Sequence, residues 1–134
     1  SIYEEMRAIA QEFGCPVWTA SQTNRSGLNA EVITMESISE AFNKCFVADF
    51  IFSVSRTIDD KTANSGRIFV AKNRNGPDGL VYPIFMDTSN VKIKVLPPTG
   101  ETPSSIVADS AKQQAQTLKD KYKKYKKQKK ENGA

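Results

Sequence analysis

The stretch RIFVAKNRNGPDGLVYPIFMD, Arg67 to Asp87, decides how this chain folds. Two runs of β-forming residues, RIFVAKNR and LVYPIFMD, flank the turn NGPDG, and this pattern predicts a β-hairpin. Because alternate side chains of a strand share a face, we expect Lys72 and Arg74 to point the same way, with Ile68 and Val70 further back. The first strand therefore begins with apolar residues and ends with two co-directed cations at the turn.

These two cations require either water or an anion, because burying like charges together without a counter-charge is costly. One interpretation is a solvated hairpin tip. The other is an anion that arrives from outside, since glycines such as Gly76 let another surface approach the turn closely. A polyphosphate suits an arginine plus a lysine, because a guanidinium binds phosphate oxygens in pairs and an ammonium acts as a point charge.

Upstream of the hairpin, the sequence predicts a helix followed by a buried strand. In SIYEEMRAIAQEFG the apolar side chains recur at spacings of three and four, and Gly14 with Pro16 ends the helix. PVWTASQ is predicted to be a short buried strand. Gln22 stands at the C-terminal end of that strand, where open α/β sheets bind ligands. A neutral amide there either contacts a terminal phosphate or its attacking water, or satisfies loop backbone.

The remaining segments complete the predicted fold. TNRSGLNAEVITME is expected to be a long loop, and MESISEAFNKCF a short helix in which Ser37 and Glu40 have capping-box spacing. ADFIFSVSRT is predicted to be a strand, IDDKTANSG a polar turn and VKIKVL a last short strand. This order of elements indicates an α/β fold whose central sheet has an antiparallel edge hairpin.

Composition excludes several classes of function. The 134 residues contain no histidine, which excludes histidine-based triads, histidine general bases and histidine-ligated metals. No apolar run approaches the roughly 18 residues of a membrane span. The acidic, amphipathic start is unlike a secretory signal, so we expect a cytoplasmic protein without a membrane partner. Cys15 and Cys45 are expected to be reduced and mostly buried thiols.

Charge divides the chain into two parts. Residues 112–134 carry nine lysines against two acids, a net +7, whereas residues 1–111 carry ten cations against thirteen acids, a net −3. We expect a folded part at 1–96, a Pro/Ser/Thr linker at 97–108 and a Lys-rich tail at 109–134, which is a frayed helix or disordered. The tail is either a solvated arm or an arm that binds nucleic acid or an acidic partner.

Three segments, in this order, resemble motifs of DnaB-like replicative helicases, which are ring-forming motor proteins with a RecA-like fold. IYEEMRAIAQEFGCPVWTASQTNR is similar to the helix, strand and glutamine motif of that family, and ADFIFSVSRT to the strand that follows. AKNRNGPDG is similar to its Lys-x-Arg-Asn-Gly-Pro-x-Gly hairpin, which is fairly specific. The resemblance covers Ser1 to about Leu96. It implies the C-terminal portion of a RecA-like P-loop ATPase domain, as in phage helicases of this type, which work in the bacterial host cytoplasm.

The resemblance also implies residue roles. Gln22 would sense the γ-phosphate of ATP, and Lys72 and Arg74, with Gly76 in their turn, would reach the ATP of a neighbouring subunit as a trans-acting finger pair. The implied DNA contacts come from the loop 24–44, and the candidates are Asn24, Arg25, Asn43 and Lys44. The basic residue that many relatives place on the following short helix is not evident, since Ser39 and Glu40 lie near its place. The implied partners are single-stranded DNA, further copies in a hexameric ring, and a primase or helicase loader.

One departure from the family concerns the phosphate-binding loop. No GxxxxGK[ST] sequence is present. Most ligands of ATP and Mg²⁺ are therefore expected in a missing N-terminal half, and this polypeptide alone is expected not to hydrolyse ATP. The leading hypothesis is a portion of an ATP-dependent DNA helicase that translocates on single-stranded DNA. The alternatives are a catalytically inactive nucleic-acid-binding remnant and another RecA-type ring ATPase, such as a recombinase or a clock-type ring protein.

Overall fold

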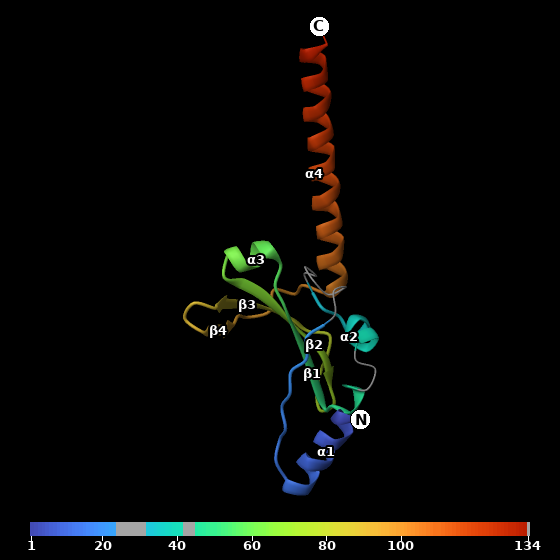
Figure 1. The fold of residues 1–134 in the computed structure, drawn as a ribbon, viewed down its shortest axis with the longest axis vertical. Coiled ribbons are helices and arrows are strands. Elements are labelled where there is room, and N and C mark those ends of the chain that lie inside the picture. Colours follow the sequence, from blue (N-terminus) through green and yellow to red (C-terminus); the bar gives the residue numbers. More distant parts are fainter. Residues whose placement is uncertain (24–31, 42–44, 134) are drawn as a thin grey trace. The chain divides into compact units, whose positions relative to one another are not determined.

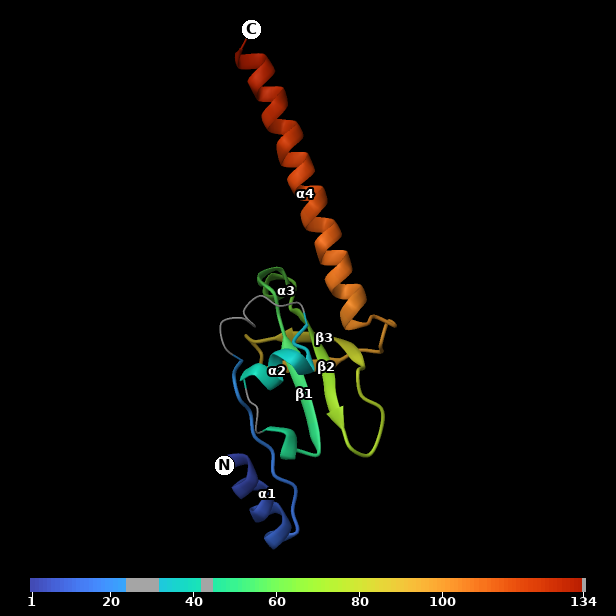
Figure 2. The same cartoon turned by 90° about the vertical axis from the view of Figure 1, so that its right-hand side faces the viewer.

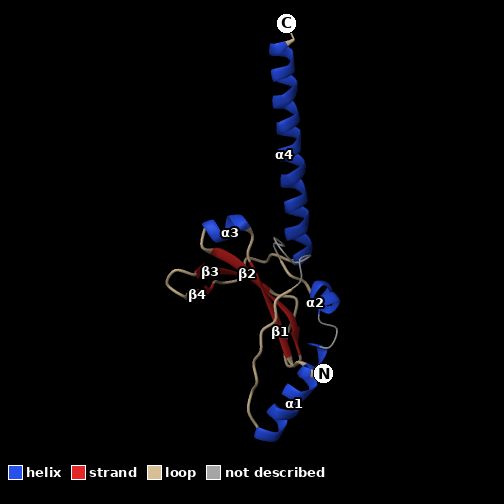
Figure 3. Ribbon diagram, viewed as in Figure 1, coloured by secondary structure: helices blue, strands red, loops and turns tan. Residues whose placement is uncertain are grey.

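A computed structural model describes residues 1–23, 32–41 and 45–133, and Figure 1 shows their fold. Contacts divide the chain into two compact units, Ser1–Pro103 and Ser104–Ala134. The first unit combines short helices with a four-stranded sheet, and the second is helical (Figure 3). The α/β composition predicted from the sequence is confirmed.

The sheet has the strand order β1-β2-β3-β4. Its strands are β1 at Phe50–Ser55, β2 at Ser65–Asn73, β3 at Val81–Asp87 and β4 at Lys92–Val95. Every neighbouring pair is antiparallel, which confirms the predicted hairpin and the two flanking strands. Among the described residues no strand pair is parallel, so the sheet seen here is antiparallel throughout.

The described residues of the first unit also form three α-helices. α1, at Ile2–Phe13, ends as predicted at Gly14, whose φ of 59° and ψ of 35° are left-handed. α2 occupies Met35–Ala41, and a single 3₁₀ turn, η2, follows at Cys45–Val47. The prediction that Ser37 caps this helix is wrong, because the helix begins at Met35 and the Ile38 amide donates to the carbonyl of Thr34 at 3.1 Å.

The segment IDDKTANSG, predicted to be a turn, contains the third helix, α3, at Ile58–Thr62. The helix forms because the Thr57 hydroxyl accepts the Asp60 amide at 3.1 Å while the Asp60 carboxylate accepts the Thr57 amide at 2.9 Å. Burial raises the pKa of Asp60, but these hydrogen bonds, one from Ser65 and the charge of Arg67 outweigh it, so the pKa lies below its ordinary value.

One face of the sheet is covered by the segment 32–41. The strand register places Ser53, Phe69 and Val81 on this face, and all three are buried. The Ser53 hydroxyl donates to the carbonyl of Ile33 at 2.6 Å, which ties the segment to β1 through a buried hydrogen bond. The segment's own buried apolar residues are Val32, Ile33 and Ile38.

The opposite face of β1 is open and aromatic. Phe50, Phe52 and Val54 alternate with the buried serines, and they remain 39–43% exposed. Trp18 lies edge-on to Phe50 and Phe52, with ring centroids 6.3 and 6.1 Å apart, and is itself 71% exposed. A surface cluster of three aromatic rings therefore lies along the edge strand.

The buried strand predicted at PVWTASQ is wrong. Residues 16–22 are extended but exposed, and they pair with no strand in the described part of the chain. The segment runs beside β1 in two perpendicular views (Figures 1 and 2). It meets β1 through the ring of Trp18, whereas a hydrogen-bonded ladder needs two backbones about 4.8 Å apart.

The second unit consists of α4, which spans Pro103–Asn132 as one continuous helix of 30 residues. It begins inside the stretch 97–108 that the sequence indicates as a linker. Proline suits this position, because its missing amide hydrogen would have no partner in a first helical turn. Across the described ranges, no helix combines the length and the apolar character that crossing a membrane requires.

Candidate functional site: two cations at the hairpin tip

The turn between β2 and β3 is built around the side chain of Asn73. Its amide nitrogen donates to the carbonyl of Pro77 at 3.2 Å, and its oxygen accepts the Asn75 amide at 3.4 Å. Gly76 passes so close that an added Cβ would lie 2.8 Å from the Asn73 amide nitrogen. Gly79 has a φ of 75°, which side-chain-bearing residues rarely adopt. These glycines are needed for the turn itself, and the role of Gly76 at a nucleotide stays a prediction.

Arg74, immediately after β2, is held by Asp49, immediately before β1. Its guanidinium Nη1 lies 2.6 Å from Asp49 Oδ1, and its backbone amide donates to the Asp49 carbonyl at 2.9 Å. The antiparallel register explains this meeting, because Phe50 pairs with Asn73 and the next residues outward are therefore opposite one another. An anion of this chain thus already contacts the arginine.

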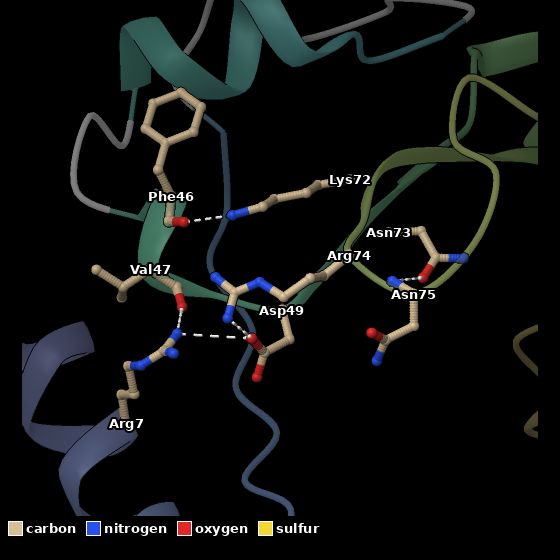
Figure 4. Close-up of polar contacts among 8 residues, drawn as sticks. All are labelled: Arg7, Phe46, Val47, Asp49, Lys72, Asn73, Arg74 and Asn75. Carbon is tan, nitrogen blue, oxygen red and sulfur yellow. Dashed lines mark hydrogen bonds and ion pairs between the residues drawn. The ribbon is translucent and has the colours of Figure 1, made fainter.

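Lys72 reaches the same segment. Its ammonium donates to the backbone carbonyl of Phe46 in η2, and Figure 4 shows both cations directed towards residues 46–49. The predicted co-direction of Lys72 and Arg74 is therefore confirmed. The prediction that Lys72 shares a face of the strand with Ile68 and Val70 is wrong. The register shifts between Ile51 and Phe52, so that Ala71 has no partner on β1. This β-bulge moves Lys72 to the face that carries Phe69.

A third cation joins the site from α1. Arg7 Nη1 lies 3.5 Å from the same Asp49 Oδ1 and donates to the carbonyl of Val47 (Figure 4). Asp49 thus lies between one arginine of the first helix and one of the hairpin. Three cations converge on a segment that offers one carboxylate and two backbone carbonyls.

The site is open to solvent. The side chains of Arg74 and Asp49 are 46% and 64% exposed, and that of Arg7 is 36% exposed. An ion pair at such exposure contributes only about 0.2–1 kcal/mol, because water screens it and the long side chains lose freedom. A phosphate that approaches the tip could therefore replace Asp49 as the partner of Arg74 at low cost.

The other predicted site residues are placed as follows. Gln22 is exposed, and the structure records no polar contact between it and the hairpin cations within the ranges it describes. Candidates Asn24, Arg25, Asn43 and Lys44 lie outside the described residues, so their predicted DNA contacts stay predictions. Cys15 is exposed, which makes the prediction of a buried thiol wrong at that position.

Sequence reasoning missed Asp49 and the carbonyl of Phe46, which contact the two cations, and it missed Arg7, the third cation of the site. A signal for Asp49 was present. When two antiparallel strands pair, the residue just before the first strand lies opposite the residue just after the second strand. No comparable signal exists for Arg7, which lies on a separate helix. None exists for the Phe46 carbonyl either, since every residue has a backbone carbonyl.

A groove of about 290 Å³ lies next to Asp49, between α1, the extended segment and the start of β1. Most of its lining is apolar and includes Met6, Val17 and Trp18. Its polar groups come from Tyr3, Arg7, Thr19 and Asp49 itself. No group of three or more acidic or cysteine side chains suited to a metal occurs within the described ranges. The convergence of Arg7, Lys72 and Arg74 on the segment 46–49 is what suits the tip to an anion.

Comparison with known proteins gives one similar sequence. The chain is 26% identical over 125 residues, 92% of its length, to a protein named DnaB-like replicative helicase of Enterobacteria phage T4. It spans 26% of that protein, about a quarter of its length. This supports a distant link to replicative helicases and so to DNA replication. No family model and no solved structure matches the chain.

Proposed function

We propose that this chain supplies the C-terminal half of the RecA-like motor domain of a ring-forming, ATP-dependent DNA helicase that translocates on single-stranded DNA. The observation that carries the proposal is the match to a phage DnaB-like replicative helicase over 92% of the chain. A helicase motor couples nucleotide hydrolysis to movement, so the chain must offer groups that contact phosphates. The hairpin tip offers them.

In this proposal Lys72 and Arg74 act in trans on ATP held by a neighbouring subunit. Two features of the tip support such a role. Both cations project towards one segment, and the ion pair that holds Arg74 is exposed and therefore weak. A guanidinium that meets a phosphate in a closed interface gains more than it loses by leaving Asp49, because charge-assisted hydrogen bonds strengthen when water is excluded.

The nucleotide fits the donor chemistry of the tip only in part. The two cations suit phosphate oxygens, but the sequence lacks a P-loop, and the described residues hold no cluster for Mg²⁺. Most contacts to ATP and Mg²⁺ would therefore come from the other half of the motor domain. Gln22 would sense the terminal phosphate, with Gly76 in the turn that approaches it.

The assembly proposed is a hexameric ring around single-stranded DNA. Asn24, Arg25, Asn43 and Lys44 would face the strand in the channel, and a primase or helicase loader would be a further partner. A phage protein of this kind would act in the cytoplasm of its bacterial host.

The test uses the longer protein that joins this chain to a P-loop-bearing half. Arg74→Ala is expected to leave ATP binding nearly unchanged and to lower DNA-stimulated hydrolysis by about 10³–10⁵-fold, the range measured for arginine fingers. Lys94→Ala removes an exposed cation from β4 and serves as the matched control. Hydrolysis by Arg74→Ala at the rate of the control would reject the finger role and leave a solvated tip.

A further inference from the structure

The long helix α4 carries two parallel stripes of side chains. A helix turns about 100° per residue, so residues spaced by three, four or seven share a side. One set at such spacings is apolar and aromatic; we call it the tyrosine stripe, and its members are Val107, Ala111, Ala115, Leu118, Tyr122 and Tyr125. Its four large side chains are 60–67% exposed.

The second set is basic and lies beside the first. We call it the lysine stripe, and its members are Lys112, Lys119, Lys123, Lys126, Lys127 and Lys130. It runs for about 27 Å along the helix, at 1.5 Å per residue. Asp109 and Asp120 lie on the far flank of the lysine stripe, away from the tyrosines. The basic charge of the helix is thus not spread evenly around it.

The two stripes meet at Tyr122. The ammonium of Lys126 lies 5.5 Å from the centroid of the Tyr122 ring, a cation–π contact. An aromatic face next to a cation is suited to a ligand that presents a flat π-system beside a negative charge. The neighbouring Tyr125, three residues on, adds a second ring about 4.5 Å further along the axis.

We propose that the two stripes of α4 form a binding surface for single-stranded nucleic acid. The lysine stripe binds successive phosphates, and Tyr122 and Tyr125 stack on unpaired bases. Single strands offer phosphates and free base faces together, whereas the stacked base pairs of a duplex hide the faces on which a tyrosine ring could stack. This surface lies outside the hairpin site, so the proposal goes beyond the proposed motor function and does not depend on it.

Charge and composition disfavour the other occupants of such a helix. A second copy of α4 packed on the tyrosine stripe would bring two lysine stripes together, and like charges at the flanks of a helix pair oppose association. A membrane surface needs a broad apolar face, but the stripe has only two large aliphatic side chains, Val107 and Leu118.

The test measures binding of the full 134-residue chain to a labelled oligothymidylate at several salt concentrations. Lys123→Gln/Lys127→Gln removes two charges from the lysine stripe, and Lys121→Gln/Lys124→Gln removes two charges off the stripe. Glutamine and lysine have similar helix propensities, so α4 is kept. We expect the first pair to reduce the slope of log K against log salt by about 1.4, at about 0.7 per lost phosphate contact, and the second pair to reduce it much less.

The tyrosines are tested separately. Tyr122→Ala and Tyr125→Ala are each expected to weaken oligothymidylate binding about 5- to 150-fold without changing the salt slope, as the loss of one stacked base does. Tyr122→Phe/Tyr125→Phe keeps both rings and should bind like the unchanged chain. Binding to heparin, a polyanion without bases, should not respond to the tyrosine changes.

Several results would overturn the proposal. If the two lysine pairs changed the salt slope equally, the position of the lysines on the helix would not matter. Binding would then be a general attraction between opposite charges. Unchanged binding by the alanine variants would remove the stacking role. Tighter binding to phosphatidylserine vesicles than to oligothymidylate would make the helix a membrane-surface element, and dimerisation through α4 would make it a self-association element.

Discussion

Replacing Asp49 with asparagine removes the carboxylate that Arg7 and Arg74 share. Its Oδ1 lies 2.6 Å from Arg74 Nη1 and 3.5 Å from Arg7 Nη1, but the Asp49 side chain is 64% exposed. Exposed pairs are worth about 0.2–1 kcal/mol each, so we expect Asp49→Asn to lower the free energy of unfolding by at most about 1–2 kcal/mol. The backbone bond from the Arg74 amide to the Asp49 carbonyl remains, so the hairpin keeps its shape.

The assay is urea unfolding followed by the fluorescence of Trp18, the single tryptophan of the chain, which contacts Phe50 next to Asp49. A double-mutant cycle of Asp49→Asn with Arg74→Gln isolates the pair, and its coupling energy should be about 0.2–1 kcal/mol at low salt. It should shrink at high salt, because exposed charges are screened.

Asp78→Asn is the matched control, since it removes one carboxylate from the turn of the hairpin, at a described residue for which the structure shows no ion pair. A coupling energy of zero at low salt would refute the reasoning. So would an Asp49→Asn variant no less stable than Asp78→Asn. Either result would mean that the hairpin cations are not held by this segment in solution.

Three further substitutions test the fold and the turn. Gly66→Ala is expected to cost about 1–3 kcal/mol in urea unfolding, because its Cβ would lie 3.0 Å from the carbonyl oxygen of Ser55, which is fixed in β1. Gly76→Ala should cost less, about 0.5–1.5 kcal/mol, because the atom it meets belongs to the Asn73 side chain, which can move by giving up one hydrogen bond. Asp60→Asn should cost about 0.5–2 kcal/mol at pH 7. Because the pKa of Asp60 is lowered in the folded chain, that difference should be full above about pH 4 and fade as the pH falls further, as unfolding at several pH values will show.

The hairpin, the edge strands and the first helix were predictable because each rests on local signals. Alternating β-forming residues and a turn that needs glycine specify β2 and β3, and Gly14 marks the end of α1. The short helix α3 was missed because the pattern of Thr57 and Asp60 stands among polar residues typical of a turn.

The strand predicted at PVWTASQ failed for a different reason. Its β-forming residues favour an extended backbone, but a strand forms only where a second backbone pairs with it through hydrogen bonds. In the described part of the chain none does, and Trp18 meets β1 through its ring. The bulge at Ala71 could not be predicted either, because the alternation of apolar and polar residues along β2 does not show where its register to β1 shifts by one residue.

The central claim is that Arg74 serves the nucleotide of a neighbouring subunit, and mixed rings test it most directly. Longer proteins that carry either Arg74→Ala or an inactivated P-loop are each expected to be inactive alone. Mixed in one ring, some interfaces pair an intact P-loop with an intact arginine, so DNA-stimulated ATPase activity should partly return. Mixed rings that assemble with wild-type subunits and yet recover no activity in any proportion would contradict the claim.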